Sequence, residues 1–114
     1  MSPARRRIVD AHHHFWNIER NHHPWLCDEP PIPFRYGDYS AIRRNYLEDD
    51  YRHDTRAYEV DGSVYVETEW DPSDHEGEMR YVRELREAGG GGRLPTVAVA
   101  HVRLDDPDAR RKLE

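Results

Sequence analysis

The amino-acid sequence predicts an α/β fold in which parallel strands alternate with helices. Three segments have the apolar or β-branched pattern of strands, and they span residues 7–11, 63–68 and 96–102. Segments with helical spacing lie before the second strand and between the second and the third. Successive strands that are separated by helices usually run parallel and are joined by right-handed crossovers, so this order favours a parallel sheet.

The first strand, RIVDA at 7–11, leads into a long segment without regular periodicity. Residues 17–40 contain four prolines and several aromatic side chains, so we expect a long ordered loop of the kind that commonly carries function. Residues 47–58 are polar and are predicted to form a helix, with Asp49 and Asp50 near its positive amino end.

The second strand, at 63–68, follows an Asp-Gly turn and alternates in side-chain character. Ser73 and Glu76 then have the spacing of a capping box, in which the serine hydroxyl bonds a free N–H of the first helical turn. The helix is predicted to end at the glycine run 89–92. Its apolar residues recur at helical spacing: Met79, Val82 and Leu85.

The third strand, TVAVAHV at 96–102, is apolar almost throughout, as expected for a strand covered on both faces. Asp106 and Pro107 predict the start of another helix, with the aspartate as its N-cap. Three such strands leave apolar faces uncovered, which predicts that the chain alone is molten, insoluble or associated as a homo-oligomer. We therefore expect residues 1–114 to be the N-terminal part of a larger domain, with a small complete α/β domain as the alternative.

The composition limits the partners and the compartment of the protein. Among 114 residues, 23 are acidic and 17 are basic, which gives a formal net charge of −6. This balance argues against nucleic acid and membrane surfaces as partners, because phosphate contacts need a basic surface. Cys27 is the single cysteine, so an intrachain disulfide is excluded and a cytoplasmic location is expected. The sequence has no run of about 18 apolar residues that would cross a membrane.

Three consecutive histidines end the first strand in the stretch DAHHHFW. If side chains alternate with a period of two, Asp10, His12 and His14 share one face and His13 lies on the other. Two imidazoles at the end of a strand can bind one cation, and Asp10 can orient a ligand beside them. A polar strand end that bonds to neighbouring loops is the alternative.

The sequence resembles the amidohydrolase-related family, the lactonase-like branch of the metal-dependent hydrolases that includes fuconolactonase and dicarboxylate lactonases. Five segments carry the resemblance along nearly the whole chain: IVDAHHHFW at 8–16, HPWL at 23–26, YLEDDYRHD at 46–54, GSVYVETEWDPSDHEGE at 62–78 and VRLDDPDA at 102–109. The family fold is an eight-stranded TIM barrel, which typically takes about 250 residues. The resemblance implies that residues 1–114 form the first three strand–helix units of such a barrel.

The resemblance also implies that His12 and His14 bind one divalent metal ion, zinc or manganese, which activates water to hydrolyse a lactone. Later strands supply the remaining ligands in the family, so we expect this chain to be inactive alone. Some relatives keep the histidine pair and work without tightly held metal. The expected substrate is a small molecule, such as a sugar lactone or a dicarboxylate lactone. A metal-dependent decarboxylase and a non-catalytic binding module are the alternatives.

Two charged residues are candidates for substrate binding, whereas the sequence assigns no catalytic residue. Glu67 ends the second strand and can polarise substrate or water, with a salt-bridged carboxylate as the alternative. Arg103 follows the third strand and can grip a substrate carboxylate by a bidentate contact. An ion pair of Arg103 with Asp105 or Asp106 is the alternative.

Aromatic and histidine side chains in the loops are harder to assign. Trp16 and Trp25 flank the long loop, where they can wall a pocket or anchor the loop by hydrophobic packing. The other histidines have no informative spacing and are predicted to be solvated: His22, His23, His53 and His75.

Overall fold

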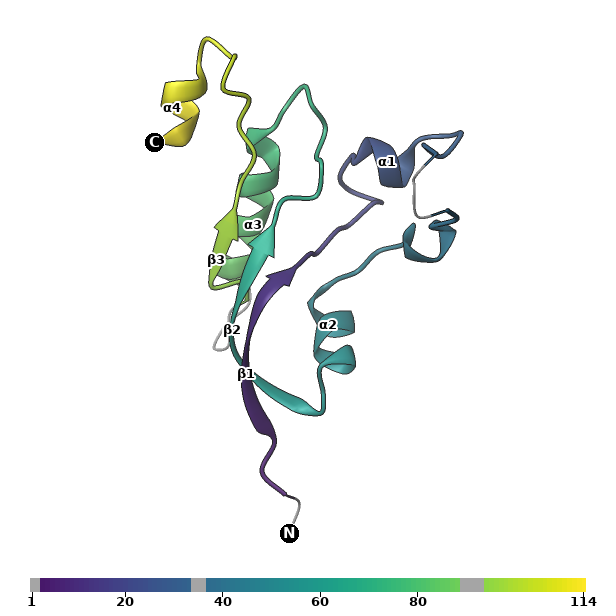
Figure 1. Ribbon diagram of the computed structural model, residues 1–114, viewed down its shortest axis with the longest axis vertical. Coiled ribbons are helices and arrows are strands. Elements are labelled where there is room, and N and C mark those ends of the chain that lie inside the picture. The colour runs from purple at the N-terminus through teal and green to yellow at the C-terminus, as the bar shows by residue number, and fades with distance from the viewer. Residues whose placement is uncertain (1–2, 34–36, 89–93) are drawn as a thin grey trace.

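A computed structural model describes residues 3–33, 37–88 and 94–114, and a three-stranded parallel sheet lies at its centre (Figure 1). The strands are β1 (Arg6–His13), β2 (Tyr58–Val66) and β3 (Val97–Val99), and they lie side by side in that order. Four helices and one 3₁₀ turn connect or follow the strands: α1 (Pro24–Cys27), η1 (Ser40–Ile42), α2 (Glu48–Asp54), α3 (Glu76–Ala88) and α4 (Ala109–Leu113).

Parallel pairing of neighbouring strands confirms the predicted α/β order, but the predicted partial TIM barrel is wrong. In the part of the chain that the structure describes, β2 pairs with β1 on one side and with β3 on the other. The two outer strands form the edges of a small open sheet. The alternation of strands and helices in a sequence favours parallel neighbours, but open sheets and closed barrels share this alternation. The alternation of strands and helices therefore could not specify whether the sheet closes into a barrel.

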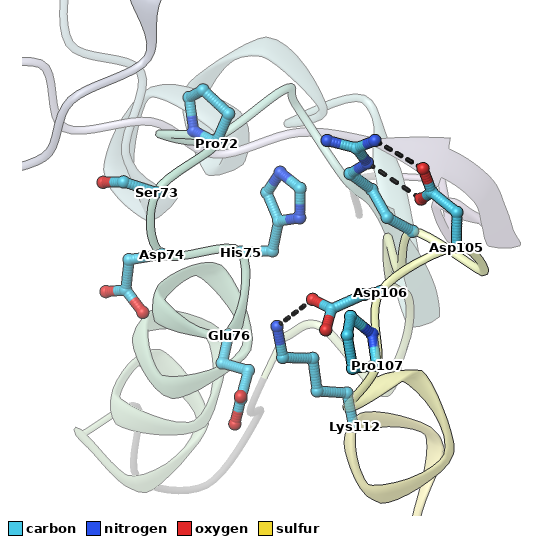
Figure 2. A pocket seen from close by; sticks show the side chains of 10 residues that line it. Pro72, Ser73, Asp74, His75, Glu76, Asp105, Asp106, Pro107 and Lys112 are labelled. Carbon is cyan, nitrogen blue, oxygen red and sulfur yellow. Dashed lines mark hydrogen bonds and ion pairs between the residues drawn. The ribbon is translucent and has the colours of Figure 1, made fainter.

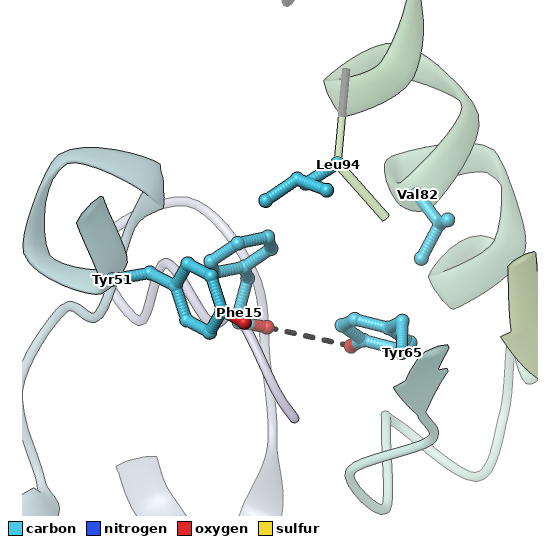
Figure 3. Packing of buried hydrophobic residues seen from close by; sticks show 5 residues of the cluster. All are labelled: Phe15, Tyr51, Tyr65, Val82 and Leu94. Atoms are coloured by element: carbon cyan, nitrogen blue, oxygen red, sulfur yellow. Dashed lines mark hydrogen bonds between the residues drawn. The ribbon is translucent and has the colours of Figure 1, made fainter. Parts of the chain in front are cut away.

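One hydrophobic core lies between the sheet and the helices α2 and α3 (Figure 3). Its buried side chains come from the sheet, the two helices and the connecting segments: Phe15, Tyr51, Tyr65, Val82 and Leu94. Tyr51 belongs to α2, Val82 to α3 and Tyr65 to β2, so both helices cover the same face of the sheet. Full burial of an apolar side chain of this size contributes about 1.5–3 kcal/mol.

The opposite face of the sheet carries exposed valines. Val9, Val97 and Val99 are 69%, 54% and 51% exposed. Val97 pairs with Val64 and Val99 pairs with Val66, and paired residues in a parallel ladder point to the same face. The apolar sequence of the third strand predicts that both of its faces are covered. This prediction is wrong, because one face is exposed.

Strand β1 contains two register shifts, and the second one reverses its side-chain alternation. Asp10 and His13 are three residues apart but pair with residues of β2 that are only two apart, Ser63 and Tyr65. A β-bulge of this kind places Asp10 and His13 on one face. The Tyr51 hydroxyl donates to Asp10 at 2.8 Å, and its ring lies 4.9 Å from the His13 ring. The predicted common face of Asp10 and the two flanking histidines is therefore wrong.

The predicted helices differ from the structure mainly at their ends, whereas α1 was missed because it lies within the segment 17–40 that was predicted to be a loop. Helix α3 begins at Glu76, and the Ser73 hydroxyl donates to Asp71 at 2.7 Å instead of forming the predicted capping box. Helix α4 begins at Ala109 with Asp108 as its N-cap, rather than at Pro107 with the predicted N-cap Asp106. The glycine run at which α3 was expected to end lies outside the described residues. Within the described ranges, no helix has the length and apolar character needed to cross a membrane.

Candidate functional site

The carboxyl ends of the three parallel strands lie at the same end of the sheet (Figure 1). His14 follows β1, Glu67 follows β2 and His101 follows β3 after one intervening residue. His14 and Glu67 line the same hollow, which has a volume of about 350 Å³ and is walled in part by Trp16 and Trp25. The structure therefore brings together residues that the sequence places at the ends of the first and second strands.

His12 and His14 lie next to each other, with ring centroids 5.0 Å apart and ring planes at 82°. The Nδ1 atom of His14 is 2.8 Å from the carbonyl oxygen of Val66. A carbonyl oxygen only accepts hydrogen bonds, so Nδ1 carries the hydrogen and Nε2 of the neutral ring presents a lone pair. His12 is exposed, and its backbone N–H donates to the Asp10 carboxylate at 3.1 Å. The pair thus offers at least one oriented nitrogen to a ligand.

The middle histidine of the run belongs to the core. His13 is 7% exposed, and its Nε2 atom lies 2.8 Å from the hydroxyl of Ser63. Its ring contacts the rings of Phe15, Tyr51 and Tyr65. Burial lowers the pKa of His13, which keeps the ring neutral at pH 7. His13 therefore differs from its two neighbours in burial and in contacts.

The histidine pair fits a metal ion as part of a site. The described residues contain no group of three His, Cys, Asp or Glu side chains that could hold a metal ion. Protein metal sites usually use three or four such ligands, and His12 and His14 would supply two of them. The hydrogen bond from His14 to Val66 is of the kind that orients metal-binding imidazoles. Any further ligand would come from outside the described ranges.

Two carboxylates lie just beyond β2. The backbone N–H of Glu69 donates to Oε2 of Glu67 at 2.8 Å, and the backbone N–H of Glu67 donates to the Val99 carbonyl at 3.0 Å. Glu69 has φ = 53°, a left-handed conformation that costs a residue with a side chain about 1–2 kcal/mol. Both carboxylates also line a second hollow of about 290 Å³, together with Trp70 and His101.

Arg103 lies away from the histidine pair. It lines a separate hollow of about 430 Å³ between the start of α3 and the segment before α4 (Figure 2). Its guanidinium donates to both carboxylate oxygens of Asp105, at 3.1 and 2.6 Å, and this contact raises the pKa of Arg103. Lys112 pairs with Asp106 in the same hollow, at 2.6 Å. Arg103 thus forms the ion pair that was the predicted alternative to substrate binding.

A buried polar network lies beside the second hollow, and no motif in the sequence predicts it. Glu78 of α3 is 2% exposed and accepts hydrogen bonds from the Tyr65 hydroxyl at 2.5 Å and from the Thr68 hydroxyl at 2.7 Å. The Thr68 hydroxyl also lies 3.0 Å from Nδ1 of His23. His23 is fully buried, so the prediction that it is solvated is wrong. No spacing in the sequence connects these residues, because they come from a loop, a strand and a helix.

The chain is similar to the uncharacterized protein y4mH of Sinorhizobium fredii (strain NBRC 101917 / NGR234), with 31% identity over 101 residues. The matched part is 89% of this chain and 33% of that protein, so the chain spans about a third of the length of this relative. No family model matches the chain. No solved structure matches it either, which leaves an open α/β sheet, and not a portion of a TIM barrel, as its fold.

Proposed function

We propose that this chain carries part of the active site of a metal-dependent hydrolase that opens a lactone or a related cyclic ester. The observation that carries the proposal is the His14 ring, whose Nδ1–H is held by the Val66 carbonyl while the His12 ring lies 5.0 Å away. A hydrogen bond of this kind fixes the tautomer and the direction of a metal-binding imidazole. The reaction class comes from the resemblance to lactonase-like hydrolases.

Five residues in or near the hollow have roles in this proposal. His12 and His14 would hold a zinc or manganese ion, which when bound acidifies water and polarises an ester carbonyl. Glu67 lines the hollow beside His14, where its carboxylate can accept a proton or a hydrogen bond from a small-molecule substrate. Trp16 and Trp25 supply apolar walls that exclude water and hold a ring-shaped substrate.

The proposal requires at least one more metal ligand from outside the described residues, contributed by further sequence or by a second subunit. The relative is about three times as long as its matched part, which is consistent with further sequence. We therefore expect the chain alone to bind metal weakly and to be inactive. A cytoplasmic setting belongs to the proposal and is supported by the single cysteine.

Calorimetric titration with zinc tests the metal pair. His12→Ala and His14→Ala should each weaken zinc binding about tenfold or more, because each substitution removes a ligand. His53→Ala is the matched control, since His53 is exposed on α2 and does not line the hollow. It should leave zinc binding unchanged. Equal losses for all three variants would indicate unspecific binding by exposed histidines and would contradict the proposal.

Two further measurements separate metal binding from hydrolysis. Long-range proton–nitrogen NMR spectra should show the Nδ1–H tautomer of His14, and zinc should perturb its Nε2 resonance but not the resonances of His13. Lactone opening, followed by proton release in a protein that includes the missing ligands, should be lost in His14→Ala. Zinc binding without hydrolysis of any lactone would overturn the hydrolase and leave a non-catalytic metal-binding module.

A further inference from the structure

Two adjoining hollows lie beyond the carboxyl ends of β1 and β2. The first, of about 350 Å³, includes His14, and the second, of about 290 Å³, includes His101. Three residues line both of them: Trp25, Glu67 and Glu69. Because they share this wall, a ligand that occupies the second hollow lies beside the hollow that contains His14. Their volumes suit a small molecule rather than a polymer.

The walls of both hollows are aromatic, and contacts hold the rings in place. All three tryptophans of the chain line one hollow or the other. The indole N–H groups of Trp16 and Trp25 donate to the carbonyl oxygens of Arg44 and Thr68, at 2.7 and 2.8 Å. The Trp16 and Trp25 rings also meet edge to face, with centroids 5.7 Å apart. Fixed indole rings are good surfaces for a cation, which the electron-rich ring face attracts.

Trp70 is held at the far side of the second hollow. Its ring centroid lies 5.1 Å from that of His23 and 5.9 Å from that of Tyr81. His23 and Tyr81 are both buried, so the indole of Trp70 packs against the interior of the protein. Trp70 is therefore positioned by the fold, and the hollow in front of it does not depend on a ligand to form.

The charge of these hollows is negative. Glu67 and Glu69 line both, and among the described residues neither carboxylate has an ion-pair partner. Glu78 also lines the second hollow, but its carboxylate is occupied by Tyr65 and Thr68. The described lining residues include no arginine and no lysine. The hollow that contains Arg103 differs, because there both of its cations are paired with aspartates.

We propose that the two hollows form one binding site for a small organic cation, in which an ammonium group lies between the indole rings and the carboxylates of Glu67 and Glu69. Binding of the cation does not depend on the proposed hydrolase activity. The inference about the substrate rests on the proposed function, and under that function the substrate is a cyclic ester that bears an amine or a quaternary ammonium group. It argues against a dicarboxylate lactone, because two free carboxylates repel an anion.

Titration with benzyltrimethylammonium tests the charge preference, and the tryptophans report on it through their fluorescence. The cation should give a saturable change that weakens as salt is added. Neutral benzyl alcohol should bind at least tenfold more weakly, and benzoate should not bind. The titration is made without metal, so failure of the hydrolase proposal would leave its outcome unaffected. Saturable binding of benzoate, or equal affinity for all three probes, would overturn the assignment.

Variants locate the site, with calorimetry as the readout because tryptophan substitutions change the fluorescence. Glu69→Gln should weaken binding of benzyltrimethylammonium about fivefold to tenfold, and Trp70→Leu should weaken it at least tenfold. Glu87→Gln is the matched control, because Glu87 is an exposed glutamate in the last turn of α3, and it should bind as the wild type does. Trp25→Phe keeps an aromatic wall and should retain most of the affinity. Glu69→Gln with wild-type affinity would overturn the proposal.

Discussion

At the scale of single residues, the surroundings of the buried His23 favour the neutral ring with its hydrogen on Nδ1. The Thr68 hydroxyl donates to the Glu78 carboxylate and so accepts from Nδ1–H of His23. Within the described residues, the Nε2 atom of His23 is buried and has no hydrogen-bond partner. Protonation of Nε2 would place an unpaired charge in the interior, and burial accordingly lowers the pKa of His23.

We predict that acidification destabilises the fold from about pH 6.5 downwards. Burial lowers the pKa values of His13 and His23 below their ordinary value of 6.5, so the unfolded chain takes up these protons first. Their contribution to stability is complete above pH 6.5 and is lost as the pH falls through the folded-state values. A pKa difference of one corresponds to about 1.4 kcal/mol. Urea unfolding at a series of pH values measures the change in free energy.

Two substitutions test the origin of this pH dependence. His23→Asn can keep a donor toward Thr68 but removes the titrating ring, so the free energy of unfolding should fall less steeply with acid. The effect of His22 on the pH dependence of stability has the opposite sign. Asp28 raises the pKa of His22, so its contribution to stability is present at low pH. It is also exposed, so His22→Asn should change the profile little. If the free energy of unfolding of His23→Asn depended on pH as that of the wild type does, His23 would not be a source of the acid destabilisation.

The location of a residue in the fold could be predicted where it directly follows a strand. His14 and Glu67 follow neighbouring strands, so the sequence places both near one edge of the sheet. His23 and Glu78 could not be predicted, because they lie far apart in the sequence and are linked only through Thr68 in the folded chain. The role of Arg103 also depended on the fold, since the sequence allowed both a substrate contact and an ion pair.

At the scale of elements, Gly77 sets the distance between α3 and Trp70. A Cβ atom at this position would lie 2.6 Å from Nε1 of Trp70 and 2.6 Å from Oδ2 of Asp74. Real Cβ atoms do not approach other heavy atoms so closely, so both side chains would have to move. The first turn of α3 can therefore lie against the indole only because residue 77 has no side chain.

We predict that Gly77→Ala destabilises the protein by about 1–2 kcal/mol, although alanine favours helices over glycine by about 1 kcal/mol. The methyl group displaces Trp70, so binding of benzyltrimethylammonium should weaken as well. Glu87→Ala, in the exposed last turn of the same helix, should change neither property. Urea unfolding and calorimetry give the two readouts. A more stable variant with normal binding would show that Trp70 does not depend on this contact.

The strands and the helices α2, α3 and α4 were predictable in type and order, whereas α1, η1 and the irregularities of the elements were not. All three predicted strands exist, because alternation and β-branching are local properties. The bulge in β1 was missed, since the alternation rule assumes unbroken pairing and the shift is set by the partner strand. The capping box at Ser73 did not form, because α3 begins at Glu76 and Ser73 lies two residues before the N-cap position.

At the scale of the whole molecule, the parallel order of the strands was predictable and the closure of the sheet was not. Helical segments between strands favour parallel neighbours. Whether an edge strand pairs with another strand depends on partners that the local pattern does not contain. The result is a sheet whose helix-covered face is buried and whose valine face is exposed in the described residues.

We predict that the chain associates through this valine face in a concentration-dependent manner, because parallel sheets are normally covered on both faces. The double variant Val97→Lys and Val99→Lys should weaken association at least tenfold, since burying a charge against a second sheet is costly. Leu113→Lys, at an exposed position of α4, is the control and should not affect it. Sedimentation velocity measures the association. A monomer at every concentration would contradict this prediction.

The bulge in β1 also has an evolutionary consequence. In a regular strand, neighbouring histidines would be tied to one another, since any change that moves one side chain across the sheet moves all of them. The extra residue before His13 breaks that dependence, so the ring in the core and the rings at the strand end follow separate constraints. Selection can then alter His12 and His14 while the packing around His13 stays the same. The site can acquire new chemistry without losing the fold that carries it.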